Sequence, residues 1–255
     1  MTRTRTLLAL VGGIAVLGGA ALAIPRGAEA PAADPAIAAS PERPVLVELF
    51  TSQGCSSCPP ADALAEKLAR EPGLVVISRA VTYWDRLGWK DTLAREGNTV
   101  LQQNYARAGL EGTNGVYTPQ LVVGGAFGTV GSRAGEVAAG IKRHAPAGDA
   151  AIRVNPAEGG GYAARLSGTG AGKAELVLLA VTRHVEVAIG SGENGGRKVG
   201  YANVLRAERK LADWRGGAAD IAVTPAELAV PGADRYALVL RQPGGGKVLA
   251  ARWLA

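Results

Sequence analysis

Two cysteines occur in the 255 residues, and only two serines separate them in the segment Cys55-Ser56-Ser57-Cys58. A thiol pair at this spacing can close into a disulfide and open again, and the thiolate is the form that attacks. The pair follows the apolar run Val45–Phe50, which predicts a buried strand. A strand that continues through a short loop into a helix would place both thiols where unpaired helical N–H groups stabilise a thiolate. Spacing and position therefore favour redox chemistry, with Cys55 as the attacking thiol and Cys58 as the resolving one.

Two other interpretations of the cysteine pair stay open. As a structural staple, a disulfide over so short a loop contributes only about 2 kcal/mol, against about 5 kcal/mol for a loop of about a hundred residues. As part of a metal site, thiolates usually need four ligands, and the sequence has no second CxxC pair and no His-x-x-x-His segment. The only methionine, Met1, belongs to a segment that we expect to be removed, so the remaining chain has no thioether ligand for copper(I).

The elements that would position the cysteines alternate between strand and helix from Val45 to His144. Strands are predicted at Val45–Phe50, Leu74–Val81, Gln120–Gly124 and Ala126–Val130, and helices at Ala61–Arg70, Thr92–Ala108 and Ser132–His144. Because a proline is best tolerated at the first helical position, the first helix is expected to begin at Pro59. The alternative is that Cys55 begins a distorted first turn. The order β-α-β-α-β-β-α, with CxxC after the first strand, predicts an α/β thioredoxin-like domain.

Thr118-Pro119 stands immediately before the third predicted strand. Thioredoxin-like folds hold a cis-proline against the cysteine pair at this place in the topology. The cis form costs an X–Pro bond only about 0.5–1 kcal/mol. The alternative is an ordinary trans proline that opens an edge strand.

A second aromatic segment, Tyr83-Trp84-Asp85-Arg86-Leu87-Gly88-Trp89, follows the second predicted strand and would emerge at the same sheet edge as the cysteines. Its tyrosine and tryptophans could form the rim of a substrate groove, or the loop could fold back on the core. Asp85 could accept a proton from Cys58, or it could pair with Arg86. Tyr83, Trp84, Asp85, Trp89, Thr118 and Pro119 are the residues predicted to bind substrate or support the active site.

Beyond Pro146 the pattern changes to glycine-rich turns and short aliphatic or β-branched runs. Strands are predicted at Ala151–Asn155, Tyr162–Ser167, Ala174–Thr182, Ala219–Val223, Tyr236–Arg241 and Val248–Trp253. Strands at short spacing predict a small all-β sandwich-like domain. We therefore expect a thioredoxin-like domain over residues 43–147 and a β-rich C-terminal domain over residues 148–255.

The N-terminus is typical of a secretory signal peptide. Arg3 and Arg5 precede the almost wholly apolar stretch Leu7–Ala23. We expect residues 1–30 to be removed and residues 31–42, rich in alanine and proline, to form a flexible tether. The alternative is an uncleaved anchor, because the apolar stretch approaches the roughly 18 residues that span a bilayer. Export to the periplasm or the extracellular space would place the cysteines in an oxidising compartment.

The charge is mild and mixed. The chain has 28 Lys and Arg against 22 Asp and Glu, a net charge of +6. It contains no block of basic residues and no aromatic residues interleaved among basic ones, so we expect a solvated mixed-charge surface and no nucleic-acid partner. Contact with a membrane is expected only through the signal segment.

The segments Leu49–Asp62, Tyr83–Asp91 and Val116–Gln120 together resemble a family of secreted bacterial thioredoxin-like proteins of unknown function, the domain of unknown function 1223. Gly192-Glu193-Asn194 and Asn203–Arg206 extend the resemblance into the C-terminal half. It implies a thioredoxin-like fold with the cysteine pair at Cys55 and Cys58, and it supplies no substrate. In that family His-Val-Asp usually precedes Tyr-Trp-Asp, whereas this chain has Ala80-Val81-Thr82, so a histidine or aspartate that could assist the thiols is missing.

The sequence thus predicts an exported thiol-disulfide oxidoreductase-like protein that exchanges disulfides through Cys55 and Cys58. It would need no cofactor, and its partners would be proteins with thiols or disulfides and a redox partner protein. The alternative is a non-catalytic extracytoplasmic module for metal or haem delivery or for envelope interaction. The scarcity of histidine, with two in the chain, disfavours metal.

Overall fold

Strand β1 (Val45–Thr51) leads directly into the cysteine loop. All 7 of its residues are buried, which requires a packed layer on each face of the strand. Its odd-numbered residues pack against α1 (Pro59–Leu68) and α3 (Ala134–Arg143), and Phe50 on the opposite face packs against α2 (Glu96–Ala108). The alternation of side chains along β1 thus sets α1 and α3 on one face of the sheet and α2 on the other.

The computed structural model describes residue 2 and residues 39–170 and 172–254. Apart from residue 2, the expected signal peptide and residues 31–38 of the expected tether lie outside the described residues. The described residues from 39 onward form one compact unit. Within the described part of the chain, no helix is both long enough and apolar enough to cross a membrane.

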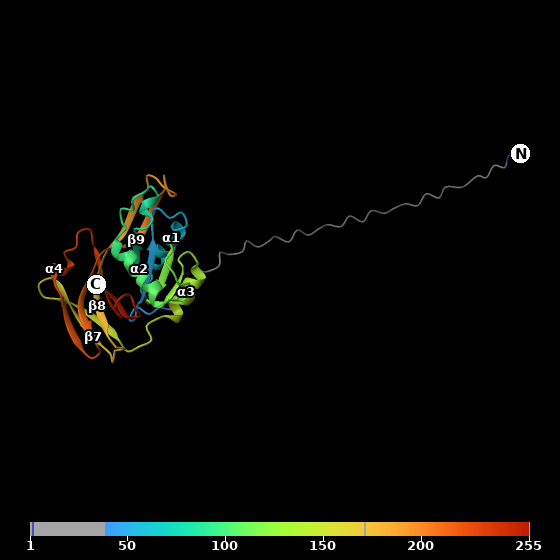
Figure 1. Ribbon diagram of the computed structural model, residues 1–255. Coiled ribbons are helices and arrows are strands. Elements are labelled where there is room, and N and C mark those ends of the chain that lie inside the picture. The colour runs from blue at the N-terminus through green and yellow to red at the C-terminus, as the bar shows by residue number, and fades with distance from the viewer. Residues whose placement is uncertain (1, 3–38, 171, 255) are drawn as a thin grey trace, which may run out of the picture. The chain divides into compact units, whose positions relative to one another are not determined.

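Nine strands of the described chain form one mixed sheet (Figure 1). In order across the sheet they are β12 (Val248–Trp253), β11 (Arg235–Arg241), β8 (Ala174–Ala188), β9 (Lys198–Trp214), β2 (Leu74–Ala80), β1, β4 (Gln120–Val123), β5 (Phe127–Val130) and β3 (Glu111–Gly112). A smaller sheet has the order β10 (Ala219–Val223), β7 (Gly161–Ser167) and β6 (Ala151–Ala157). It packs on the C-terminal strands of the large sheet through apolar side chains such as Leu166, Leu178 and Leu240. Two short helical segments, η1 (Asp85–Leu87) and α4 (Pro225–Leu228), complete the described elements.

The predicted fold class, an α/β thioredoxin-like domain followed by a small all-β sandwich-like domain, is wrong. Strands β8, β9, β11 and β12 of the C-terminal half continue the same sheet as β1, β2 and β4 instead of forming a separate sandwich. Strand residues predominate, and the described chain has four α-helices. The boundary expected at residues 147 and 148 falls in the connection between α3 and β6.

The fold class was wrong because strand β9 was not recognised in the sequence. Its 17 residues include the charged segment Arg206–Lys210, a pattern typical of a polar surface segment. In the structure β9 pairs with β8 along almost its whole length and joins β2 on its other side. The part of β8 beyond Val181 pairs with β9 and not with β11, so the two strands extend as a long hairpin.

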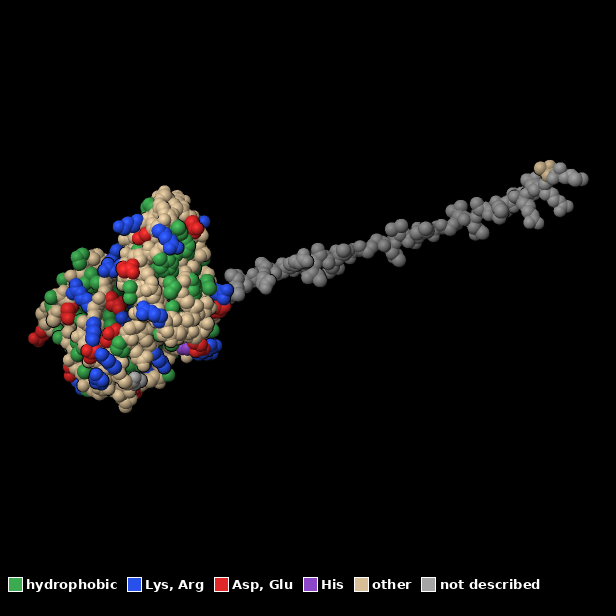
Figure 2. Space-filling model, viewed as in Figure 1, with side chains coloured by type: hydrophobic (Ala, Val, Ile, Leu, Met, Phe, Trp, Pro, Cys, Tyr) green, Lys and Arg blue, Asp and Glu red, His purple; other side chains and the backbone are tan. Residues whose placement is uncertain are grey.

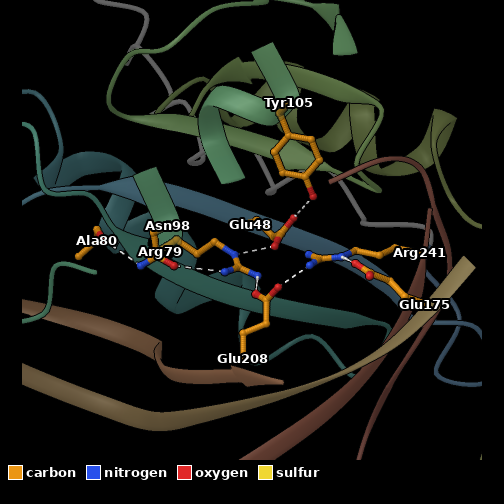
Figure 3. A network of polar contacts seen from close by, with 8 residues as sticks. All are labelled: Glu48, Arg79, Ala80, Asn98, Tyr105, Glu175, Glu208 and Arg241. Carbon is orange, nitrogen blue, oxygen red and sulfur yellow. Dashed lines mark hydrogen bonds and ion pairs between the residues drawn. The ribbon is translucent and has the colours of Figure 1, made fainter. Parts of the chain in front are cut away.

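An ionic network joins the two halves of the sheet (Figure 3). Arg79 of β2 donates hydrogen bonds to Glu48 of β1 at 2.6 Å and to Glu208 of β9 at 2.8 Å. Arg241 of β11 contacts Glu208 as well, and Tyr105 of α2 donates to Glu48 at 2.5 Å. Burial opposes the charge of Glu208, but the two guanidinium groups outweigh it and lower the pKa of Glu208 to about 2. Glu208, one of the charged residues that made β9 hard to recognise in the sequence, thus bonds β9 to β2.

Acidic and basic side chains are interspersed on the face of the body shown in Figure 2, and neither sign is gathered into one large patch there. The excess of basic residues, a net charge of +6 over the whole sequence, therefore does not form a single basic patch on this face. The expectation that nucleic acid is not a partner stays a prediction.

Candidate functional site

The cysteine pair lies in the loop between β1 and α1, where Cys55 and Cys58 form a disulfide with their Cα atoms 5.4 Å apart. The Cys58 N–H donates to the Cys55 carbonyl oxygen at 3.1 Å, which closes a tight turn. Helix α1 begins at Pro59, as predicted, and Cys58 is its N-cap residue. Pro59 and Pro60 occupy helical positions whose N–H groups would have no partner within the helix, so the helix can begin directly behind the disulfide.

The disulfide is covered. Both cysteines are 0% exposed, whereas Ser56 and Ser57 between them are exposed. The Ser57 hydroxyl lies 3.4 Å from Cys55 Sγ. A partner thiol can reach Cys55 only after some of the groups packed around the pair have moved.

Trp84 connects the cysteine loop to the proline segment. The peptide bond between Thr118 and Pro119 is cis, as predicted. Trp84 Nε1 donates to Thr118 Oγ1 at 2.8 Å. A Cβ added to Gly54 would lie 3.3 Å from Trp84 Cβ, so Trp84 packs on the residue before Cys55. The structure therefore brings these predicted site residues together.

Pro119 also lies near the first turn of α1. A Cβ added to Gly131 would be 3.1 Å from Ala61 Cβ and 3.4 Å from Pro119 Cβ. A side chain at Gly131 would fill the space between them, so the glycine permits this close approach. The cis-proline segment and the start of α1, with its N-cap cysteine, are neighbours.

Tyr83 and Trp89, the other two aromatic residues of the loop, are directed toward the core. Trp89 Nε1 donates to Gln53 Oε1 at 2.8 Å. Tyr83 packs on the apolar cluster around Phe50, and burial raises the pKa of Tyr83. Asp85 Oδ1 accepts a hydrogen bond from the Asp91 N–H at 3.1 Å, so Asp85 shapes the loop rather than bonding to the disulfide. These contacts match the alternative in which the loop folds back on the core.

Asp91 anchors the same loop to the cysteine segment. Asp91 directly precedes the predicted helix Thr92–Ala108 in the sequence, but α2 begins at Glu96. Asp91 is buried, and its carboxylate accepts from the Gln53 N–H and from the Leu93 N–H, each at 2.8 Å. Burial raises the pKa of Asp91, and the two backbone hydrogen bonds oppose that rise.

Asp62 is a candidate site residue that the sequence analysis missed. It lies one helical turn after Cys58 and is 1% exposed. Its Oδ1 accepts from Thr51 Oγ1 at 2.7 Å, while its Oδ2 has no hydrogen-bond partner among the described residues. Burial raises the pKa of Asp62 well above its usual value, and the nearby Asp91 adds to the rise. The spacing Cys58-x-x-x-Asp62 was a usable signal, because residues i and i+4 share one face of a helix.

Two further residues missed by the sequence analysis come from the turn between β8 and β9. Asn194, which is 1% exposed, donates from Nδ2 to the carbonyl oxygens of Gln53 at 3.0 Å and Cys55 at 2.8 Å. Glu193 Oε2 accepts from the Ser56 N–H at 3.0 Å. In the sequence, Gly192-Glu193-Asn194 stands out only as part of the family resemblance, because nothing local indicates that a long hairpin carries this turn to the cysteine loop.

Metal binding needs a cluster of side chains that can act as ligands. Among the residues that the structure describes, no group of three or more His, Cys, Asp or Glu side chains could hold a metal ion. Cys55 and Cys58 are bonded to each other.

The chain is similar to one protein family and to solved structures. Residues 46–241 match the family described as "Protein of unknown function (DUF1223)". The crystal structure of protein AGR_C_4864 from Agrobacterium tumefaciens is similar to the chain with a TM-score of 0.70 and 29% sequence identity, over 82% of this chain and 93% of that one. HBP35 of Porphyromonas gingivalis gives a TM-score of 0.49 and 10% identity, over 85% of this chain and 76% of that one. None of the curated proteins matches the chain.

Proposed function

The chain belongs to the DUF1223 family of proteins of unknown function, and we propose that it is an exported thiol–disulfide exchange protein acting through Cys55 and Cys58. The observation that carries the proposal is the position of the disulfide, which closes the loop at the start of α1 beside Pro119. The cysteine pair lies at the positive end of the α1 dipole, which favours a thiolate, the reactive form of cysteine. The apolar stretch Leu7–Ala23 supports export to the periplasm or the extracellular space.

Exchange from the closed state starts with a thiolate of a partner protein. The partner sulfur attacks Cys55 Sγ, a new S–S bond forms to Cys55, and the Cys55–Cys58 bond breaks. The electron pair of the broken bond goes to Cys58, which then takes up a proton. A second partner thiolate attacks the partner sulfur of the mixed disulfide and releases Cys55 as a thiolate. The partner loses two electrons and becomes a disulfide, and an external disulfide-bearing redox partner returns the cysteine pair to the closed state by the same steps in reverse.

Asp62 is the residue we assign to proton transfer at Cys58. Burial raises its pKa, which favours the protonated carboxyl, and its Oδ2 has no hydrogen-bond partner among the described residues. The carboxyl can protonate the Cys58 thiolate when the disulfide opens and take the proton back when it closes. A positioned acid or base of this kind typically contributes about 10²–10⁴-fold to a rate. Asp85, the candidate from the sequence, is bonded to the Asp91 N–H instead.

A second candidate function is a disulfide that does not exchange and only holds the loop between β1 and α1. The observation in its favour is the complete burial of both cysteines. A reactive cysteine is usually partly exposed, whereas a buried structural cysteine is inert. The two candidates differ in whether the pair forms mixed disulfides with other proteins.

Partner trapping tests the proposed function. A Cys58→Ser variant retains the attacking thiol and lacks the resolving one, so it should accumulate mixed disulfides through Cys55 that a reductant releases on a gel. The Cys55→Ser variant is the matched control. It also keeps one thiol, but that thiol is Cys58, the N-cap residue of α1, which is the resolving cysteine and not the attacking one. Equal recovery of partners with both variants, or none with either, would support the non-exchanging disulfide.

A further inference from the structure

The turn Ile189–Arg197 between β8 and β9 is closely packed against the cysteine site, and the proposed function leaves it without a role. In Figure 1 it is the orange turn at the top of the body, beside the loop that follows β2. The turn is bonded within itself, with the Gly196 N–H donating to the Ile189 carbonyl oxygen at 2.8 Å and the Arg197 N–H donating to the Asn194 carbonyl oxygen at 3.1 Å. It therefore has a defined shape independent of the groups that it covers.

The turn is fastened to the aromatic loop by one side chain and by close packing. Ser191 Oγ donates to the Gly88 carbonyl oxygen at 2.8 Å. A Cβ added to Gly190 would lie 2.9 Å from Trp89 Cζ3, and one added to Gly192 would lie 3.3 Å from Trp89 Cβ. Glycine at these two positions lets the backbone of the turn lie directly on the indole ring. Trp89 is thus a support for the turn, in addition to its hydrogen bond with Gln53.

The second fastening is to the cysteine loop itself. Asn194 bridges the carbonyl oxygens of Gln53 and Cys55 with its single amide group. Glu193 accepts the N–H of Ser56, the residue that follows Cys55. Hydrogen bonds from the Ser56 hydroxyl and backbone N–H lower the pKa of Glu193, so this carboxylate is charged at neutral pH. A negative charge is therefore held at the N–H of Ser56, next to Cys55, the cysteine that would have to become a thiolate.

We propose that Glu193 and Asn194 are positioning residues that keep the Cys55–Cys58 disulfide covered, and that the Glu193 carboxylate suppresses thiolate formation at Cys55, so that exchange requires the turn Ile189–Arg197 to move away. The inference rests on the proposed function, because the reactivity of Cys55 matters only if the pair exchanges. A like charge disfavours the charged form of a nearby group, and a backbone N–H that a carboxylate occupies is not available to a thiolate. Moving the turn removes both effects and uncovers the sulfur at the same time.

Chemical reactivity of the thiol gives the test. In a Cys58→Ser background, the rate of Cys55 alkylation by iodoacetamide as a function of pH reports the pKa of that thiol. Glu193→Gln keeps an oxygen that can accept the Ser56 N–H but removes the charge, so it should lower the Cys55 pKa by about 0.5–1 unit. Glu158→Gln removes an exposed carboxylate from the turn after β6 and should leave the pKa unchanged.

Reduction of the closed disulfide by dithiothreitol reports the covering effect. Asn194→Ala and Glu193→Ala should each speed reduction by about tenfold, with Glu158→Ala at the rate of the unchanged chain. Asn194 is buried, so its replacement could unfold the turn and speed reduction for that reason alone. Glu193 is exposed, so faster reduction in its variants reports the loss of its contact with the cysteine loop. An unchanged Cys55 pKa in Glu193→Gln, together with unchanged reduction rates in both alanine variants, would overturn the inference.

Both readouts use small reagents and no partner protein, so the inference and the proposed function can fail separately. If Cys58→Ser traps partners but the Glu193 variants behave like the unchanged chain, the proposed function stands and the positioning role is wrong. If the Glu193 variants change the pKa and the reduction rate but no partner is trapped, the positioning role stands and the exchange function is wrong.

Discussion

The Asn194 side-chain amide lies 2.8 Å from the Cys55 carbonyl oxygen, although the two residues are 139 positions apart in sequence. This contact joins the tip of the β8–β9 hairpin to the loop that carries the disulfide. Any change in that loop when the disulfide opens must be accommodated at Asn194, and any movement of the hairpin tip must release the Cys55 carbonyl. The C-terminal half of the chain is therefore coupled to the chemistry of the cysteines through a side chain rather than through a domain interface.

Replacing Asn194 by Ala should lower the free energy of unfolding by about 2–4 kcal/mol, because two carbonyl oxygens near the disulfide lose their side-chain donor. Urea unfolding of the oxidised protein measures this change. Asn155→Ala is the matched control, because Asn155 is exposed on β6, and it should change stability by less than about 0.5 kcal/mol. Equal stability of the two variants would show that the Asn194 contacts are dispensable.

Replacing Asp62 by Asn should make the protein more stable at alkaline pH and leave it nearly unchanged at pH 3. The folded state raises the pKa of Asp62, so it binds the proton more tightly than the unfolded state does. The contribution of Asp62 to the free energy of unfolding is therefore largest below the pKa that Asp62 has in the unfolded chain. It falls as the pH rises toward the pKa that Asp62 has in the folded protein, by at most about 1.4 kcal/mol per pH unit. The amide of the Asp62→Asn variant cannot titrate, so the gap between the two proteins should widen from pH 4 upward.

Urea unfolding of both proteins between pH 3 and pH 9 measures this gap. Asp220→Asn is the control, since Asp220 on β10 has a side-chain exposure of 73%. A constant difference across the range would mean that Asp62 has an ordinary pKa in the fold. The same Asp62→Asn protein should also reduce more slowly with dithiothreitol at neutral pH, by about tenfold or more, because Cys58 loses its proton donor.

Replacing Glu208 by Gln should destabilise the protein at pH 7 by about 3 kcal/mol, because Arg79 and Arg241 are left without their shared carboxylate. The folded state lowers the pKa of Glu208 to about 2. Its contribution is therefore present above the unfolded pKa and is lost as the pH falls toward 2.

The difference between the unchanged chain and Glu208→Gln should accordingly shrink between about pH 4.5 and pH 2. Unfolding free energies at pH 7, 4 and 2.5 measure this convergence, and Glu158→Gln serves as the exposed control. If Glu208→Gln were as stable as the unchanged chain at pH 7, the network in Figure 3 would not be what holds β9 beside β2.

Local patterns predicted the part of the site that depends on neighbours in sequence. The mostly apolar run Val45–Phe50 indicates β1, Pro59 indicates where α1 begins, and Thr118-Pro119 occupies the predicted place before β4. Each of these follows from backbone restrictions or from burial within a few residues. The register of β1 with β2 and β4 then brings the three segments to one edge of the sheet.

What the sequence could not predict depends on distant pairing. The charged residues of β9 are typical of a surface, and only the folded sheet brings Arg79 and Arg241 to Glu208. Gly192-Glu193-Asn194 is typical of a turn, and only the length of the β8–β9 hairpin carries it to Cys55. The error in fold class and the missed residues Glu193 and Asn194 therefore have one origin, the unrecognised strand β9. Asp62 was missed for a different reason, because its spacing from Cys58 was present in the sequence but was not used.

The most direct test of the central claim is the reduction potential of the Cys55–Cys58 pair, measured by equilibration of the purified protein with dithiol and disulfide mixtures of known potential. A pair that exchanges with partner proteins should have a potential within the range of exchange proteins, about −270 to −120 mV, and should be reduced by a thioredoxin-type reductant. A potential below about −300 mV, together with resistance to that reductant, would identify a structural disulfide and contradict the exchange function.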